Sequence, residues 1–131
     1  AYATLYAIKK NKRVTLAIRG VRWYDTKVAL ITYLLANLIN LNLKGKIKKL
    51  YLDREFFSIA VIRWLKALDI PFIMPAIRRG KKGGIKQFLK GNKSYKTTYT
   101  MGAGEDNSVT FNLWIVCKYK KGKRGKYGIE Y

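Results

Sequence analysis

The side chains of this 131-residue chain that suit metal or phosphate chemistry are seven carboxylates and 28 lysines and arginines. The chain has no histidine, and Cys117 is its one cysteine, which excludes histidine general bases, Ser-His-Asp triads and thiolate metal clusters. Among the acids, Asp53 follows directly on the apolar run Leu50-Tyr51-Leu52. A carboxylate at the carboxyl end of a buried parallel strand lies where open α/β sheets build their sites, and hard cations bind oxygen ligands. Asp53 is therefore the candidate catalytic and metal-binding residue.

Asp53 also has a purely structural interpretation. Asp is a leading N-cap residue, and a helix is expected directly after it. Phosphoryl transfer on DNA commonly uses two metal ions, which one carboxylate cannot hold. The local pattern alone favours the helix cap, and it predicts a solvated pair of Arg54 and Glu55 beside it.

The positive charge is dense in two stretches of the C-terminal half, residues 78–96 and 118–126. The net charge is +21, and such an excess makes a compact state repel itself unless a polyanion offsets it. The first stretch holds eight basic residues, no acid and four glycines, which let the backbone approach phosphates. We expect contacts to a nucleic-acid backbone rather than a plain solvated face, made by Arg78, Arg79, Lys81, Lys82, Lys86, Lys120, Lys121, Lys123, Arg124 and Lys126.

Aromatic residues lie within and beside these stretches. They either stack on unpaired bases or pack half-buried in strands, and their strand spacing favours packing for Tyr95, Tyr99, Tyr119 and Tyr127. Residues 78–86 lack the G-x-x-x-x-G-K-[ST] spacing of a nucleotide-binding loop. Cys117 lies in an apolar run, and a buried small hydrophobe is its simplest role.

The elements that must position these groups follow from hydrophobic periodicity. Residues 2–8 and 13–19 predict a β-hairpin, and Asp25 or Thr26 caps a largely buried helix over residues 27–42. A strand covered on both faces is then expected over residues 47–52, a helix over 57–68 and a second strand over 70–74. A strand, a helix and a strand in this order predict that the two strands are parallel. After these elements the sequence predicts a short helix over residues 85–89 and a hairpin with strands over 95–101 and 109–119. A last strand is expected over residues 127–131.

Two motifs in this order resemble a known family. Leu52-Asp53-Arg54-Glu55-Phe56 and Ile70-Pro71-Phe72-Ile73-Met74-Pro75 look like the "LDREF" and "IPFIMP" elements of archaeal insertion-sequence transposases of the DDE type. The resemblance implies that Asp53 is the second of three catalytic acids, and that the first lies on a strand before Ala1. It implies phosphoryl transfer on DNA with Mg²⁺ or Mn²⁺ once the site is complete.

The third acid departs from the family pattern. Glu130, in Tyr127-Gly128-Ile129-Glu130-Tyr131, resembles part of the family's glutamate helix, yet Gly122, Gly125 and Gly128 oppose a helix. Glu130 is therefore predicted to be a strand residue. On this interpretation one of three metal ligands is present and the chain is catalytically incomplete.

The resulting fold prediction is an α/β, RNase H-like mixed sheet with two main helices, followed by a basic β-rich insertion or hairpin. Residues 1–76 form the partial core, and residues 77–131 form the basic loop and hairpin extension of the same domain. The free edges of the strands at residues 2–8 and 47–52 are templates for pairing, so a homodimer is expected to cover them.

The functional prediction is a DNA-binding, transposase-derived protein or fragment. The alternatives are a non-enzymatic nucleic-acid-binding protein of a virus or mobile element, and an RNA-binding structural protein. The apolar run at residues 28–43 is shorter than the ~20 residues that cross a bilayer, so we expect no membrane partner and a cytoplasmic location. Gln occurs once, at Gln87, and this charged, amide-poor composition resembles that of thermophile proteins.

Overall fold

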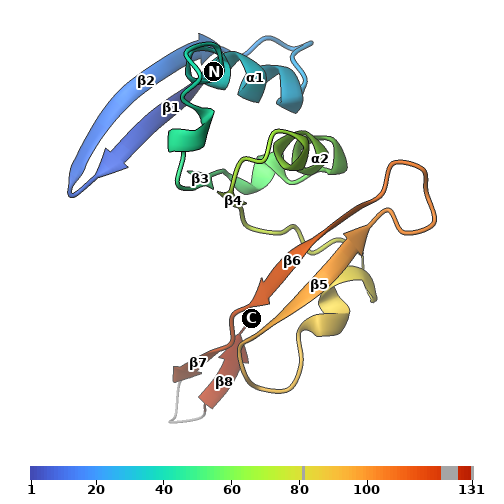
Figure 1. Cartoon of the computed structure of the whole chain (residues 1–131). Helices are drawn as coiled ribbons and strands as arrows, with labels where there is room; N and C mark the ends of the chain where they lie inside the picture. The colour runs from blue at the N-terminus through green and yellow to red at the C-terminus, as the bar shows by residue number, and fades with distance from the viewer. Residues whose placement is uncertain (81, 122–126, 131) are drawn as a thin grey trace. The chain divides into compact units, whose positions relative to one another are not determined.

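The computed structural model describes residues 1–80, 82–121 and 127–130. The chain divides into two compact units, Ala1–Pro75 and Ala76–Tyr131 (Figure 1). The predicted α/β class with two main helices is confirmed. Within the described residues, however, the strands form four two-stranded sheets instead of one continuous mixed sheet.

The first unit opens with an antiparallel hairpin of β1 (Tyr2–Lys9) and β2 (Lys12–Gly20), which confirms the predicted hairpin. Lys10 and Asn11 form its turn with φ of 34° and 66°. Positive φ at both central positions matches a two-residue hairpin turn whose twist suits the flanking strands, and Asn tolerates it well. The pairing register shifts between Leu5 and Tyr6, so a bulge bends the hairpin.

Helix α1 (Lys27–Asn40) begins where the Thr26 hydroxyl accepts a hydrogen bond from the Ala29 N–H at 3.0 Å. It ends before Asn42, which takes the left-handed conformation common after a helix. The prediction that this helix is largely buried was wrong, because only the face carrying Leu30, Ile31, Leu34 and Leu35 is covered. No helix among the described residues has the length and apolar character needed to cross a membrane.

The short strands β3 (Leu50–Tyr51) and β4 (Phe72–Ile73) form the predicted parallel pair. The Leu50 N–H donates to Pro71 O at 2.8 Å, and the Leu52 N–H donates to Ile73 O at 3.0 Å. Both strands are shorter than the predicted ranges of residues 47–52 and 70–74. The 3₁₀ helix η1 (Lys44–Lys46) precedes β3, and residues 47–49 between them belong to no strand. Tyr51 is 70% exposed, so the expectation that the first of these strands is covered on both faces was also wrong.

Between β3 and β4 lie the 3₁₀ helix η2 (Arg54–Phe56) and the helix α2 (Ile59–Ala67). The Ser58 hydroxyl caps α2 by accepting from the Val61 N–H at 3.3 Å. The core of the unit lies between α1, α2 and the residue Ile70, which follows α2. Its buried residues are Ile31, Leu35, Val61, Leu65 and Ile70.

The second unit contains the 3₁₀ helix η3 (Gly84–Phe88) and the strands β5 (Tyr95–Met101), β6 (Val109–Ile115), β7 (Lys118–Lys121) and β8 (Tyr127–Glu130). Strands β5 and β6 form one antiparallel hairpin, and β7 and β8 form another. The predicted strand over residues 109–119 is interrupted at Val116 and Cys117, and Cys117 is half-buried rather than buried. The small core consists of Ile85, Val109, Leu113 and Ile115.

Two leucines test the core of the first unit. Leu65 has no exposed surface, whereas Leu41 is 69% exposed at the end of α1. We expect Leu65→Ala to lower the free energy of unfolding by about 2–5 kcal/mol, because it leaves a cavity. Leu41→Ala, the matched control, should change it by less than about 0.5 kcal/mol. Urea denaturation followed by circular dichroism measures both, and equal effects would contradict the core assignment.

Candidate functional site

Asp53 lies at the carboxyl end of β3, as the sequence predicts, and its side chain is exposed. Its Oδ1 atom accepts a hydrogen bond from the Glu55 N–H at 3.0 Å, so Asp53 is the N-cap of η2. Glu55 in turn forms a 3.4 Å ion pair with Lys27. The cap interpretation is confirmed, whereas the expected pairing of Arg54 with Glu55 is replaced by the ion pair from α1.

The residues around Asp53 do not fit a two-metal centre. Within residues 1–80, 82–121 and 127–130, no group of three or more His, Cys, Asp or Glu side chains is placed to hold a metal ion. One oxygen of Asp53 is already engaged by a backbone N–H. Asp53 therefore contributes a single carboxylate, which is too few ligands to hold two metal ions.

The second unit brings the two basic stretches of the sequence together. The Tyr119 hydroxyl donates to Asn92 O at 2.7 Å, and the Cys117 N–H donates to Ser94 Oγ at 2.8 Å. These bonds attach the start of β7 to the end of the first basic stretch. The tertiary fold thus joins cations that are far apart along the chain.

Glu130 feels the charge of cations from both basic stretches. Lys120 Nζ lies 2.5 Å from Glu130 Oε2, and Lys118 is opposite Glu130 in the β7–β8 register. The hydrogen bond and the charge of Lys120 lower the pKa of Glu130 below its usual value, and the charges of Lys118 and Arg78 act in the same direction. Arg78 belongs to the first basic stretch and the two lysines to the second, so we call Arg78, Lys118 and Lys120 the cation cluster. The prediction that Glu130 is a strand residue is confirmed.

The charge of the second unit is uneven along the β5–β6 hairpin. Its turn carries the exposed acids Glu105 and Asp106, next to the pair Met101 and Val109. The other end of the hairpin leads into β7 and β8, where the cation cluster lies (Figure 1). One end of this unit is therefore acidic and the other strongly basic.

The other residues predicted to contact nucleic acid are not part of the cation cluster. Arg79 and Lys82 are exposed, and Lys86 Nζ donates to Gly80 O. Lys121 ends β7, but Lys81, Lys123, Arg124 and Lys126 lie outside the described residues.

The aromatic residues divide between packing and exposure. Tyr99 packs edge-on between Phe88 and Phe111, with ring centroids 6.1 and 5.8 Å away. Tyr95 is half-buried and bonds to Phe88 O, whereas Tyr119 is 65% exposed. The prediction that the tyrosines pack is thus confirmed for Tyr95 and Tyr99. It was wrong for Tyr119, which is exposed and whose hydroxyl bonds to Asn92 O between the two basic stretches. The prediction that Tyr127 packs concerns a side chain outside the part of the chain that the structure describes.

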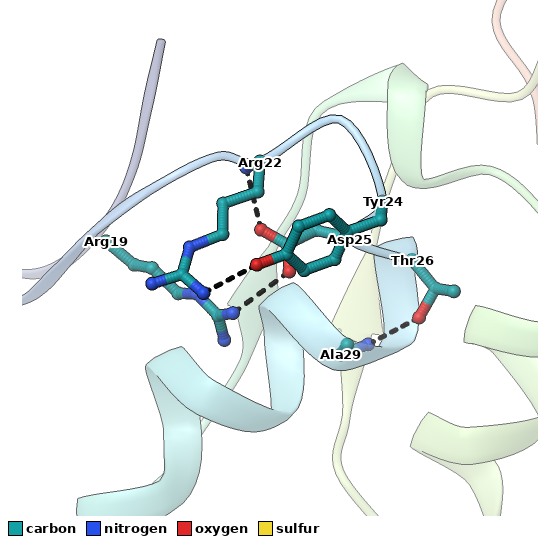
Figure 2. A network of polar contacts seen from close by, with 6 residues as sticks. All are labelled: Arg19, Arg22, Tyr24, Asp25, Thr26 and Ala29. Carbon is teal, nitrogen blue, oxygen red and sulfur yellow. Dashed lines mark hydrogen bonds and ion pairs between the residues drawn. The ribbon is translucent and has the colours of Figure 1, made fainter.

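A second basic and aromatic surface was not predicted from the sequence. Figure 2 shows Asp25 accepting from Arg19 Nη2 at 2.9 Å and from the Arg22 N–H at 2.8 Å, while Arg22 Nη1 bonds to the Tyr24 hydroxyl at 2.6 Å. Trp23 is 95% exposed beside them. The signal that could have found this loop is the run Arg22-Trp23-Tyr24 between a predicted strand and a capped helix, since exposed aromatic and guanidinium groups together suit base stacking and phosphate contact.

No family model matches the chain, and no curated protein or solved structure is significantly similar to it.

Two substitutions at Asp53 test its structural role. Asp53→Ala removes the acceptor for the Glu55 N–H, and we expect it to lower the free energy of unfolding by roughly 0.5–1 kcal/mol. Asp53→Asn retains a side-chain oxygen that can cap, so stability should stay close to that of the original chain. Thermal or urea unfolding measures both variants. Equal stability of the alanine variant would show that the cap contributes nothing.

Proposed function

We propose that this chain binds nucleic acid, and DNA in particular, through the phosphate backbone. The observation that carries the proposal is the cation cluster: Lys120 forms an ion pair with Glu130, Lys118 lies opposite Glu130 in the β7–β8 register, and the charge of Arg78 acts on the same carboxylate. With 28 cations and seven carboxylates, one-to-one pairing leaves at least 21 cations without an acid. A polyanion supplies the missing charge, and Lys and Arg give affinity that is independent of sequence.

The proposal includes a transposase origin for the first unit, with an RNase H-like core. It is supported by the parallel β3–β4 pair, by α2 between the two strands and by Asp53 at the carboxyl end of β3. These features occur in the order of the two motifs that resemble archaeal transposases. That resemblance implies three acids around Mg²⁺ or Mn²⁺, and Asp53 supplies one of them. By itself the chain is then a DNA-binding but catalytically incomplete protein.

A second candidate function is a non-enzymatic nucleic-acid-binding protein, for example of a virus or mobile element. The use of Asp53 as a cap for η2 favours it, because this role needs no metal. Titration with Mg²⁺ separates the two. A shift of the Asp53 carboxyl resonance in NMR spectra supports retained catalytic ancestry, whereas an unchanged resonance supports the non-enzymatic protein.

The strength of DNA binding should fall steeply with salt. A protein with 6–10 phosphate contacts loses roughly 10³–10⁵ in affinity between 50 and 200 mM salt, because bound counterions are released on binding. Fluorescence anisotropy with a labelled duplex measures this dependence. Flat affinity across the range would contradict the proposal. A parallel series with a folded RNA that binds more tightly than the duplex would favour the RNA-binding alternative instead.

Matched triple variants locate the contact surface. Arg79→Ala/Lys82→Ala/Lys120→Ala removes three exposed cations of the second unit, and the slope of log K against log salt should fall in magnitude by about 2.7. Lys10→Ala/Lys12→Ala/Arg63→Ala removes the same charge from exposed positions of the first unit and serves as the control. Equal losses in both variants would mean that binding is spread over the whole surface and would refute the basic end of the second unit as the interface.

Glu130 should act as an internal competitor of phosphate. Glu130→Gln releases Lys120 and removes a negative charge from the cation cluster, so DNA affinity should rise about threefold to tenfold at 100 mM salt. Glu105→Gln makes the same charge change at the acidic end of the β5–β6 hairpin and should have little effect. Because Lys120 lowers the pKa of Glu130 below its usual value, lowering the pH from about 7 to about 5 leaves this carboxylate charged and should not mimic the substitution. Unchanged or weaker binding by Glu130→Gln would contradict the role.

A further inference from the structure

The turn between β2 and α1 presents an aromatic side chain to solvent. The Asp25 N–H donates to Arg22 O at 3.1 Å, so residues 22–25 form a β-turn whose central residues are Trp23 and Tyr24. Trp23 is 95% exposed, so most of its indole ring is open to solvent. Single exposed aromatic residues are common on protein surfaces, and the features that distinguish Trp23 are the rigidity of its turn and the charge beside it.

Hydrogen bonds to Asp25 fix the shape of this turn. The side chain of Asp25 is only 4% exposed and accepts from Arg19 Nη2 at 2.9 Å and from the Arg22 N–H at 2.8 Å (Figure 2). Directly after the turn, the Thr26 hydroxyl caps α1. Because the turn is ordered before any ligand arrives, a contact to Trp23 costs little conformational entropy.

The two guanidinium groups of this turn have different partners. Arg19 forms the ion pair with Asp25, and its guanidinium lies 4.6 Å from the centroid of the Tyr33 ring. The side chain of Arg22 is exposed and bonds instead to a neutral group, the Tyr24 hydroxyl, at 2.6 Å. The positive charge of Arg22 is therefore available to an anion such as a phosphate group, which a guanidinium binds strongly.

An open depression of about 490 Å³ lies beside the turn. Its lining residues are Ile18, Arg19, Gly20, Val21, Arg22 and Tyr33. The lining combines guanidinium groups, a phenol ring and aliphatic side chains, and it includes no acid among the residues that the structure describes. A volume of this order accommodates a small ligand such as one nucleotide unit.

This combination of groups matches the chemistry of single-stranded nucleic acid. Unpaired bases stack on exposed aromatic rings, and Arg or Lys binds the phosphates between them. In a duplex, neighbouring base pairs cover the faces of each base. An unpaired base is therefore the part of a nucleic acid that can offer its face to Trp23.

We propose that the turn at Trp23 binds an unpaired nucleotide of a single strand. The base stacks on the indole ring of Trp23, and Arg22 binds the adjoining phosphate beside the depression. This inference rests on the proposed binding of nucleic acid and adds a preference for single-stranded segments to it. The cation cluster of the second unit contacts the phosphate backbone of any nucleic acid, whereas the turn distinguishes unpaired from paired bases.

Two labelled probes separate stacking from phosphate contacts. One is an oligothymidylate of about 12 nucleotides, which forms no duplex, and the other is a blunt-ended duplex of about 12 base pairs. In fluorescence anisotropy, Trp23→Ala should weaken binding of the oligothymidylate by about fivefold to 150-fold, the loss expected for one stacked base, and should leave duplex binding unchanged. Trp23→Phe retains an aromatic ring and should keep most of the affinity. Tyr51→Ala removes a 70% exposed ring elsewhere in the first unit and should change neither affinity.

The phosphate contact is tested by Arg22→Ala. This change removes the guanidinium but keeps the backbone N–H that binds Asp25, so the turn keeps its shape. For the oligothymidylate, the slope of log K against log salt should fall in magnitude by about 0.7, the value for one phosphate contact of a single strand. Arg63→Ala removes an exposed arginine of α2 and should leave this slope unchanged. Trp23→Ala should also leave it unchanged, because indole carries no charge.

Tryptophan fluorescence reports the stacking directly. The chain has three tryptophans, so in Trp64→Phe/Trp114→Phe all tryptophan emission comes from Trp23. The oligothymidylate should quench this emission, because a base stacked on indole quenches its fluorescence. The duplex should leave the emission unchanged.

Duplex binding by the original chain tests the proposed function separately. If the chain binds the duplex, and Trp23→Ala binds the oligothymidylate as tightly as the original chain does, only the inference about the turn is wrong. Equal loss of both probes in Trp23→Ala would overturn it as well, because the contact would not distinguish unpaired bases. So would a dimer in light scattering that Trp23→Ala dissociates, since the turn would then bind protein. If neither probe binds the original chain, the proposed function fails and this inference fails with it.

Discussion

The packing of α1 against α2 is the interaction on which the first unit depends. Ile31 and Leu35 of α1 meet Val61 and Leu65 of α2, and Ile70 closes the same core at the turn before β4. Burial of each such side chain contributes about 1.5–3 kcal/mol. Because the core anchors the ends of β3 and β4, it also places Asp53 at their carboxyl edge. Asp53 and the parallel strand pair therefore depend on one small hydrophobic core.

The small number of acids determines how the positive charge of the chain is arranged. With seven carboxylates for 28 cations, each acid has a strong effect on its surroundings. Asp25 fixes the loop between β2 and α1, Asp53 caps η2, and Glu55 joins η2 to Lys27. Glu130 lies within the cation cluster of the second unit. In these four places the acid organises the local backbone or the nearby cations, and the positive charge that remains is available to an external polyanion.

The two proposed binding surfaces use different physics. The basic end of the second unit presents charge on exposed side chains, which suits the repeating phosphates of nucleic acid without regard to sequence. The turn at Trp23 in the first unit presents an aromatic ring beside a guanidinium group, which suits the face of an unpaired base and its phosphate. Its selectivity comes from stacking, for which a paired base offers no free face. Binding at one surface does not require the chemistry of the other, so separate variants can address each.

The sequence by itself determined the local elements and the electrostatic character. Alternation and cap residues located the hairpin strands over residues 2–8 and 13–19, within one residue of the observed ends of β1 and β2, and the start of α1 at Lys27. These signals act within a few residues of the chain. Only the tertiary structure decided that one face of α1 is buried and that the charge of Arg78 acts on Glu130 together with those of Lys118 and Lys120. It also decided that Arg19 of β2 lies over the ring of Tyr33 in α1, beside the turn at Trp23. These outcomes depend on contacts between residues distant in the chain, which no local pattern of charge or hydrophobicity encodes.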